Sequence, residues 1–121
     1  MKYKLLLAGK SHAIIDDFFY VLNEEFACLT TSLRTSDILN HIQYFQPDAF
    51  VYCMAAETSE NIQKVVTALG TVERRNINFF LIGDAESCNE FMRIKSQMVD
   101  LVMEKPILAS SIREEIINYF I

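Results

Sequence analysis

The chain has 121 residues, of which 51% are hydrophobic and 22% are charged, a balance typical of one globular domain and unlike that of a disordered segment. Its net charge is −5 and its basic residues are scattered, so we expect no direct binding to nucleic acid, which requires clustered cations. No apolar run approaches the roughly 20 residues that span a bilayer, and Met1–Lys10 is too short and too charged for a secretory signal. These features predict a single cytoplasmic domain over residues 1–121, without membrane attachment.

The cysteines predict a reducing compartment. Cys28, Cys53 and Cys88 contain no Cys-x-x-Cys pair, and their number is odd. The two histidines, His12 and His41, have no partners at the spacing of zinc ligands. We therefore expect reduced thiols, no metal site and no cofactor.

The first half of the chain alternates short apolar runs with amphipathic ones. A strand is predicted over Tyr3–Ala8, and Ser11 is the predicted cap of the next helix. The apolar residues at helical spacing in that helix are Ile14, Ile15, Phe18, Phe19 and Leu22. A second strand is predicted over Phe26–Thr31, followed by a helix that begins at Ser36 and closes before Pro47.

The alternation continues beyond Pro47. The third strand is predicted over Ala49–Met54, and the next helix runs toward Gly70, a residue that ends or weakens a helix. The adjacent basic pair Arg74–Arg75 is placed at that helix end, where it complements the helix dipole. The fourth strand is predicted over Ile77–Ile82.

The last third carries one more strand between two helices. Ser87 and Glu90 form a capping-box pattern for the fourth helix, and Val99–Met103 is the fifth predicted strand. Ser111 with Glu114 is the predicted cap of the last helix. Because the strands read as continuous apolar runs, we predict a parallel sheet covered by helices on both faces. The expected fold class is α/β, a doubly wound five-stranded parallel sheet in the order 2-1-3-4-5, which is a flavodoxin-like three-layer sandwich.

Two short motifs resemble those of a known family. Pro47-Asp48 leads into the third predicted strand, and Lys105-Pro106 directly follows the fifth. In this register the whole chain resembles the receiver domains of two-component response regulators. The resemblance implies a cis peptide bond between Lys105 and Pro106, and a signalling role rather than an enzymatic one.

The family's working residues are carried over position by position. Receivers hold Mg²⁺ with two acidic residues after the first strand, and those positions are Gly9 and Lys10 here. The phospho-accepting aspartate corresponds to Cys53, and the Ser/Thr after the fourth strand corresponds to Gly83, or to Ile82 if the register shifts by one.

Two further positions complete the family's site. The aromatic switch residue corresponds to Val102, whereas Lys105 is retained. Because Mg²⁺ needs carboxylate oxygens and phosphoryl transfer needs the metal, the sequence predicts a degenerate receiver that is not phosphorylated. We expect Lys10 and Lys105 to approach the same end of the sheet, with Glu57 or Asp84 as internal counterions.

The expected partner of such a module is another protein or a covalently linked output domain. The resemblance also implies a homodimer through the face made by the fourth helix, the fifth strand and the last helix. The side chains expected to contribute to that face are Phe91, Met92, Met98 and Ile117.

Three other interpretations stay open. The first is a phosphorelay receiver with an unconventional acceptor, Asp48 or Glu57, and the second is a redox sensor centred on a Cys53 thiolate favoured by the two lysines. The third is anion binding at the helix start beside Lys10. The segment Ala8-Gly9-Lys10-Ser11 resembles the end of a phosphate-binding loop, but Lys4 occupies the position of that motif's first glycine.

Overall fold

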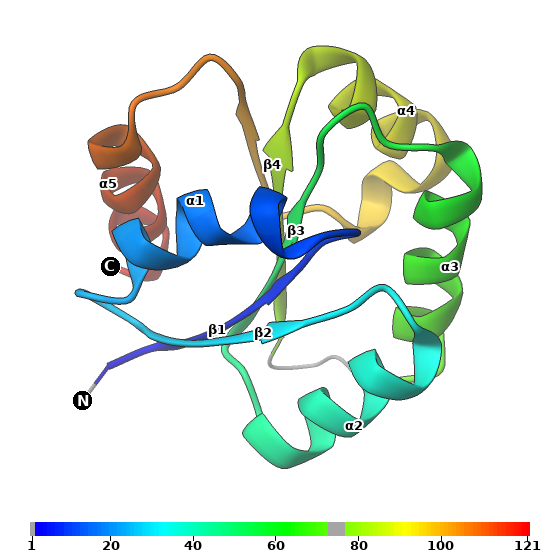
Figure 1. Ribbon diagram of the computed structural model, residues 1–121, viewed down its shortest axis with the longest axis horizontal. Helices are drawn as coiled ribbons and strands as arrows, with labels where there is room; N and C mark the ends of the chain where they lie inside the picture. Colours follow the sequence, from blue (N-terminus) through cyan, green and yellow to red (C-terminus); the bar gives the residue numbers. More distant parts are fainter. Residues whose placement is uncertain (1, 73–76) are drawn as a thin grey trace.

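A computed structural model describes residues 2–72 and 77–121. Five parallel strands form one sheet in the order β2-β1-β3-β4-β5, as predicted (Figure 1). The strands are β1 (Lys4–Ala8), β2 (Ala27–Thr31), β3 (Ala49–Cys53), β4 (Asn78–Gly83) and β5 (Leu101–Glu104). The first and last residues of each predicted strand lie within two residues of the observed bounds. The agreement is close because uninterrupted apolar runs mark strands that are buried on both faces.

Five helices complete the alternation and cover both faces of the sheet. They are α1 (His12–Leu22), α2 (Thr35–Phe45), α3 (Ser59–Gly70), α4 (Ala85–Lys95) and α5 (Ala109–Phe120), and a 3₁₀ turn over Ser96–Met98 follows α4. Figure 1 shows α1 and α5 together on one side of the sheet and α2, α3 and α4 on the other. No helix in the described ranges is long and apolar enough to cross a membrane.

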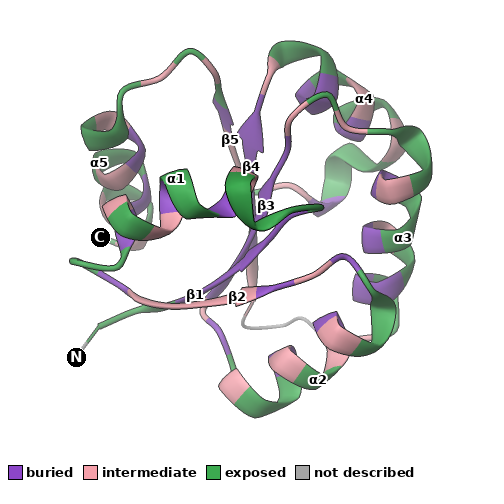
Figure 2. Cartoon of the chain, in the orientation of Figure 1, coloured by how far each residue is buried: buried purple, intermediate pink, exposed green. Residues whose placement is uncertain are grey.

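The sheet separates two hydrophobic cores, because successive strand side chains point to opposite faces. Leu6 and Tyr52 pack under α2, α3 and α4, whereas Leu7, Val51 and Cys53 pack under α1 and α5. Figure 2 shows the buried colour concentrated on β1, β3 and β4 and on the inner side of the helices. Complete burial of a Leu or Phe side chain contributes about 1.5–3 kcal/mol, so these two cores hold the three layers together.

The predicted helix caps are less accurate than the predicted strands. Ser11 does precede α1, but its side chain makes no capping hydrogen bond. Ser36, Ser87 and Ser111 are wrong as caps, because each helix begins one or more residues earlier and these serines lie inside its first turn. The residue before α4 is Asp84, whose carboxylate accepts the amide hydrogen of Ser87. A capping side chain must stand immediately before the first helical residue, and spacing from Glu90 did not locate that position.

The C-terminal ends of α2 and α3 lie close to the positions predicted from Pro47 and Gly70. Gly70 is the last residue of α3, and α2 ends at Phe45, after which Gln46 adopts a left-handed conformation with φ of 51° before Pro47. The predicted position of Arg74–Arg75 lies outside the described residues.

Candidate functional site

The residue after β1 is in tight contact with β3 and α1. A Cβ atom placed on Gly9 would lie 2.8 Å from Cγ1 of Ile15 and 3.2 Å from the carbonyl oxygen of Cys53. The first distance is shorter than real contacts of this kind, so Ile15 would have to move to admit a side chain. Glycine at this position thus lets the β1–α1 loop approach the end of β3.

Cys53 ends β3 and its side chain is fully buried under α1 and α5. Burial raises the pKa of its thiol to about 12, an effect that the nearby charge of Lys105 only partly opposes and Cys28 slightly reinforces. The thiol is therefore protonated at neutral pH. This environment opposes the reactive thiolate that the redox interpretation requires, because reactive cysteines are exposed and have a lowered pKa.

Gly83 and Val102 both make packing contacts within the fold. A Cβ atom on Gly83 would lie 2.9 Å from Cβ of Met54 and 3.0 Å from its carbonyl oxygen, so the end of β4 packs directly against the residue after β3. Val102 pairs with Leu81 in the sheet and packs, half-buried, against the core under α2, α3 and α4.

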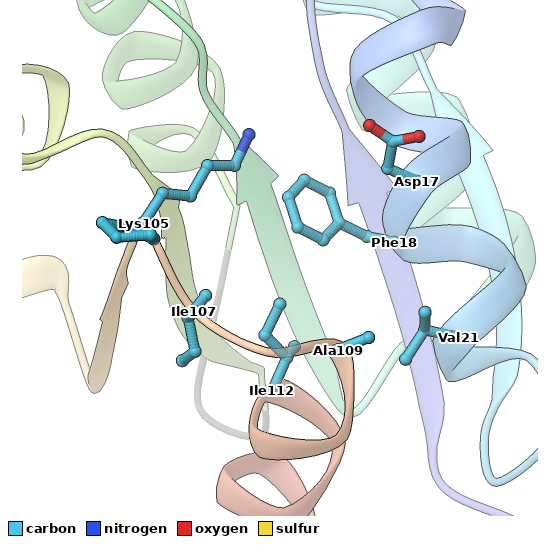
Figure 3. A pocket seen from close by; sticks show the side chains of 8 residues that line it. Asp17, Phe18, Val21, Lys105, Ile107, Ala109 and Ile112 are labelled. Carbon is cyan, nitrogen blue, oxygen red and sulfur yellow. The ribbon is translucent and has the colours of Figure 1, made fainter.

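Lys105 follows β5, and both its backbone and its side chain make defined contacts. Its amide donates to the carbonyl oxygen of Gly83 at 2.8 Å, and its peptide bond to Pro106 is cis, as predicted. Figure 3 shows its side chain extending toward Phe18 of α1, with Nζ 4.8 Å from the ring centroid. The two residues line a cavity of about 570 Å³ between α1 and α5, and Asp17 stands on its far side. The ammonium group of Lys105 is thus engaged in a cation–π contact with Phe18.

Lys10 and Lys105 do not share a cavity. Nζ of Lys10 donates to the carbonyl oxygen of Ala56 at 3.1 Å, and its side chain lines two cavities near the start of α2. The cavity lined by Lys105 lies instead between α1 and α5. The structure therefore brings Gly9 next to Cys53 and Lys105 next to Gly83, and in the described residues the two lysines make different contacts, with Ala56 and with Phe18.

Asp84 is occupied by hydrogen bonds rather than by a lysine. Its Oδ1 accepts from the amide of Ala56 at 3.0 Å and from Oγ of Ser87 at 2.7 Å, and its Oδ2 accepts from the amide of Ser87 at 3.1 Å. Partial burial alone would raise its pKa, but these hydrogen bonds hold the pKa below its ordinary value. Oγ of Ser87 also accepts from the amide of Glu57 at 2.9 Å. These four residues join the β3–α3 and β4–α4 loops, and we call them the loop clamp.

The sequence pattern does not predict the clamp, because the spacing of Ser87 and Glu90 indicates Ser87 as the helix cap. The available signal was Asp84 itself, an aspartate directly after an apolar strand and three residues before a serine. Asp84 was expected as a counterion, and in the described residues it pairs with no lysine.

The other candidate acids also have structural roles. Oε1 of Glu57 accepts from the amide of Thr58 and from Nδ2 of Asn61, at 3.0 and 2.8 Å. Its second oxygen and the hydroxyl of Tyr52 are buried and have no hydrogen-bond partner among the residues that the structure describes. Burial, reinforced by the charge of Glu57, raises the pKa of Tyr52 above its usual range.

Asp48 lies at the opposite, amino edge of the sheet. Its Oδ2 accepts from the amide of Lys4 at 2.7 Å, and its carbonyl oxygen accepts from the amide of Asn78 at 2.9 Å. It therefore connects the starts of β1, β3 and β4, which explains an aspartate before β3 without any transfer chemistry.

The residues expected on a dimer face divide into two kinds. Phe91 is completely buried and Met98 is 7% exposed, so both belong to the core and are wrong as contact residues. Met92 is 36% exposed and Ile117 is half-buried. Helical periodicity alone did not separate the inner from the outer apolar positions of α4.

Known structures share this architecture across almost the whole chain. A CheY-like response regulator receiver domain protein from Methanospirillum hungatei JF-1 has a TM-score of 0.73 at 13% identity, and the alignment covers 98% of this chain and 94% of that one. A CheY-like receiver domain from Methylobacillus flagellatus has a TM-score of 0.73 at 15% identity over 98% of both chains. The response regulator DrrB, a Thermotoga maritima OmpR/PhoB homologue, matches with a TM-score of 0.67 at 15% identity, over 99% of this chain and 53% of its own.

These similarities establish the fold, which is that of receiver domains. No protein-family model matches the sequence, and no curated protein matches it either.

Proposed function

We propose that this chain is a receiver-like signalling module that acts through protein–protein contacts without aspartyl phosphorylation. The observation that carries the proposal is Cys53. At the position where the resemblance puts the phospho-acceptor, the chain has a fully buried thiol with a pKa near 12. A protonated, buried thiol has neither the charge nor the access to accept a phosphoryl group.

The surroundings of Cys53 support the same conclusion. Gly9 and Lys10 supply no carboxylate for Mg²⁺, and Gly9 has no space for a side chain unless Ile15 moves. Gly83 has no hydroxyl, and Met54 packs against it where a Cβ atom would stand. Phosphoryl transfer depends on a metal ion that neutralises the developing charge, so these replacements act together.

We infer that the partner is a protein or a covalently linked output domain, as receiver folds also occur within longer chains such as DrrB. We place a homodimer contact on the surface of α4, β5 and α5, where Met92 of α4 and Tyr119 of α5 are exposed. The module is proposed to work in the cytoplasm, with Cys28, Cys53 and Cys88 as free thiols.

The direct test combines metal binding with phosphodonor treatment. Isothermal titration with millimolar MgCl₂ is expected to give no saturable heat, and intact-mass spectrometry after acetyl phosphate is expected to show no added mass. A conventional receiver domain under the same conditions is the positive control. A stoichiometric, Mg²⁺-dependent gain of one phosphoryl group would overturn the proposal, and peptide mapping would then decide between Asp48 and Glu57.

A gain-of-function variant tests the placement of the residues. Gly9→Asp, Lys10→Asp and Cys53→Asp together should begin to restore Mg²⁺ binding, provided that Ile15→Ala makes room for the new side chain at position 9. Ile15→Ala alone is the matched control and should bind no metal. If the folded quadruple variant binds no Mg²⁺, positions 9, 10 and 53 do not form one metal site.

A further inference from the structure

A cavity lined by several basic side chains lies beside the proposed degenerate site. It measures about 980 Å³ and is bordered by the loops after β1 and β2 and by the N-terminal halves of α2 and α3. Its lining residues are Lys10, Ser32, Leu33, Arg34, Thr35, Ser36, Leu39, Asn61 and Lys64. We call it the cationic pocket, because three side chains in this lining are basic and none is acidic.

This charge distribution is unusual for the molecule. The chain has a net charge of −5, and eleven basic residues against sixteen acidic ones, yet three of the basic residues line one cavity. Like charges that line one cavity repel one another, and an anion bound there relieves that repulsion. Nothing in the fold requires Arg34 and Lys64 to lie on the same cavity, since both side chains belong to exposed residues.

The nearby acids compensate these cations only weakly. Oε1 of Glu60 is 3.9 Å from Nζ of Lys64, with the two side chains 82% and 54% exposed, so this pair contributes little. Asp37 accepts a hydrogen bond from Ser32 at 2.6 Å and lines the neighbouring cavity instead. Oε1 of Glu57 accepts a hydrogen bond from Nδ2 of Asn61, and Glu57 does not line the pocket. Among the described residues, Arg34 has no carboxylate within ion-pair distance.

The position in the fold agrees with ligand binding. In a sheet of the order 2-1-3-4-5, the order of the strands reverses between β1 and β3, and ligands of such folds bind beyond the carboxyl ends of the strands at this point. Lys10 follows β1, and Asn61 and Lys64 belong to the helix that follows β3. Thr35 and Ser36 add hydroxyl groups, and Leu33 and Leu39 add an apolar wall.

We propose that the cationic pocket binds a phosphorylated small molecule. Arginine matches the geometry of phosphate oxygens through paired hydrogen bonds, and lysine contributes a point charge, so one arginine and two lysines fit a multiply charged phosphate or pyrophosphate group. The volume exceeds that of a single phosphate and lies at the upper end of small-molecule sites, which leaves space for an organic group against Leu33 and Leu39. This inference goes beyond the proposed function and does not depend on it.

Isothermal titration of the intact chain with ADP, with inorganic pyrophosphate and with uncharged adenosine tests the proposal, in low-salt buffer without divalent metal. Saturable binding of one ADP or one pyrophosphate, with adenosine inert and affinity falling as salt is raised, is expected. Tighter binding of ADP would identify an organic phosphate as the ligand class, and tighter binding of pyrophosphate an inorganic one. No saturable heat with either phosphate up to millimolar concentration overturns the proposal.

Two pairs of variants locate the site. Arg34→Ala is expected to weaken binding about tenfold, whereas Lys95→Ala, which removes an exposed cation from α4 outside the pocket, should leave it unchanged. Ser36→Asp puts a negative charge into the pocket at a helix start, a place where aspartate favours folding, so binding should disappear without loss of thermal stability. Ser110→Asp makes the same change in the first turn of α5 and should not affect binding. Equal effects of the two members of either pair would overturn the assignment.

Discussion

The two halves of the sheet's carboxyl edge differ in how the polar groups of their loops are paired. On the side of β3 and β4, the loop clamp of Asp84, Ser87, Ala56 and Glu57 satisfies its polar groups internally. On the side of β1 and β2, the cationic pocket keeps three basic side chains around open space. The comparison shows that one edge of a sheet can combine two arrangements of polar groups: one half is closed by internal hydrogen bonds, and the other carries basic side chains around a cavity.

The largest expected effect concerns the closed half, at the end of β3. Cys53→Asp should lower the free energy of unfolding by about 3 kcal/mol or more at neutral pH, because it buries a carboxylate under α1 and α5. Cys53→Ala, the control for lost volume, should cost about 1 kcal/mol. Urea unfolding followed by circular dichroism measures both. Similar costs for the two changes would mean that the end of β3 admits water, which would weaken the argument from burial.

The next effect concerns the loop clamp. Asp84→Ala removes the cap of α4 and the link to Ala56, and should lower the free energy of unfolding by about 2 kcal/mol. Asp16→Ala changes an exposed aspartate on α1 and should stay within about 0.5 kcal/mol of the parent. Hydrogen exchange should also show faster exchange at the amide of Ala56 in the first variant. An unchanged unfolding midpoint would show that the clamp does not hold the loops together.

The pH dependence of stability should sharpen the same contrast. The folded-state pKa of Asp84 is below its ordinary value of 3.8, so its contribution is fully present above pH 3.8 and is lost as the pH falls through the folded pKa. Asp84→Asn should therefore flatten the loss of stability below pH 4, measured by urea unfolding at a series of pH values. Glu90, whose hydrogen bonds from Arg93 and then Ser59 lower its pKa to about 2, should preserve part of the acid dependence. A profile parallel to that of the parent would contradict the assignment.

The smallest expected effect belongs to the open half. Arg34→Ala should change the free energy of unfolding by less than about 0.5 kcal/mol, since the described residues offer this cation no ion pair. Thermal unfolding measures it, with Asp84→Ala for comparison. A loss as large as that from the clamp would mean that Arg34 stabilises the fold, and the two halves of the edge would then both be structural.

The sequence by itself determined the layers, the strands and the order of elements. Runs such as Leu5–Leu6–Leu7 and Phe79–Phe80–Leu81–Ile82 can be satisfied only by burial on both faces, and this requirement is local and strong. The sequence also located Cys53 and Lys105 at the carboxyl edge, because parallel strands end at a common edge. The caps at Ser36, Ser87 and Ser111 were wrong, because a cap depends on where the preceding loop ends as well as on the residues near it.

Only the tertiary structure decided which side chains meet. Lys10 and Lys105 follow different strands at the same edge, and the sequence could not reveal that one turns to Ala56 and the other to the Phe18 ring. Nor could it show that Arg34 and Lys64, thirty residues apart, line one cavity with Lys10. The physical reason is that long side chains reach several ångströms across loops, so their contacts depend on the packing of neighbouring helices and not on spacing along the chain.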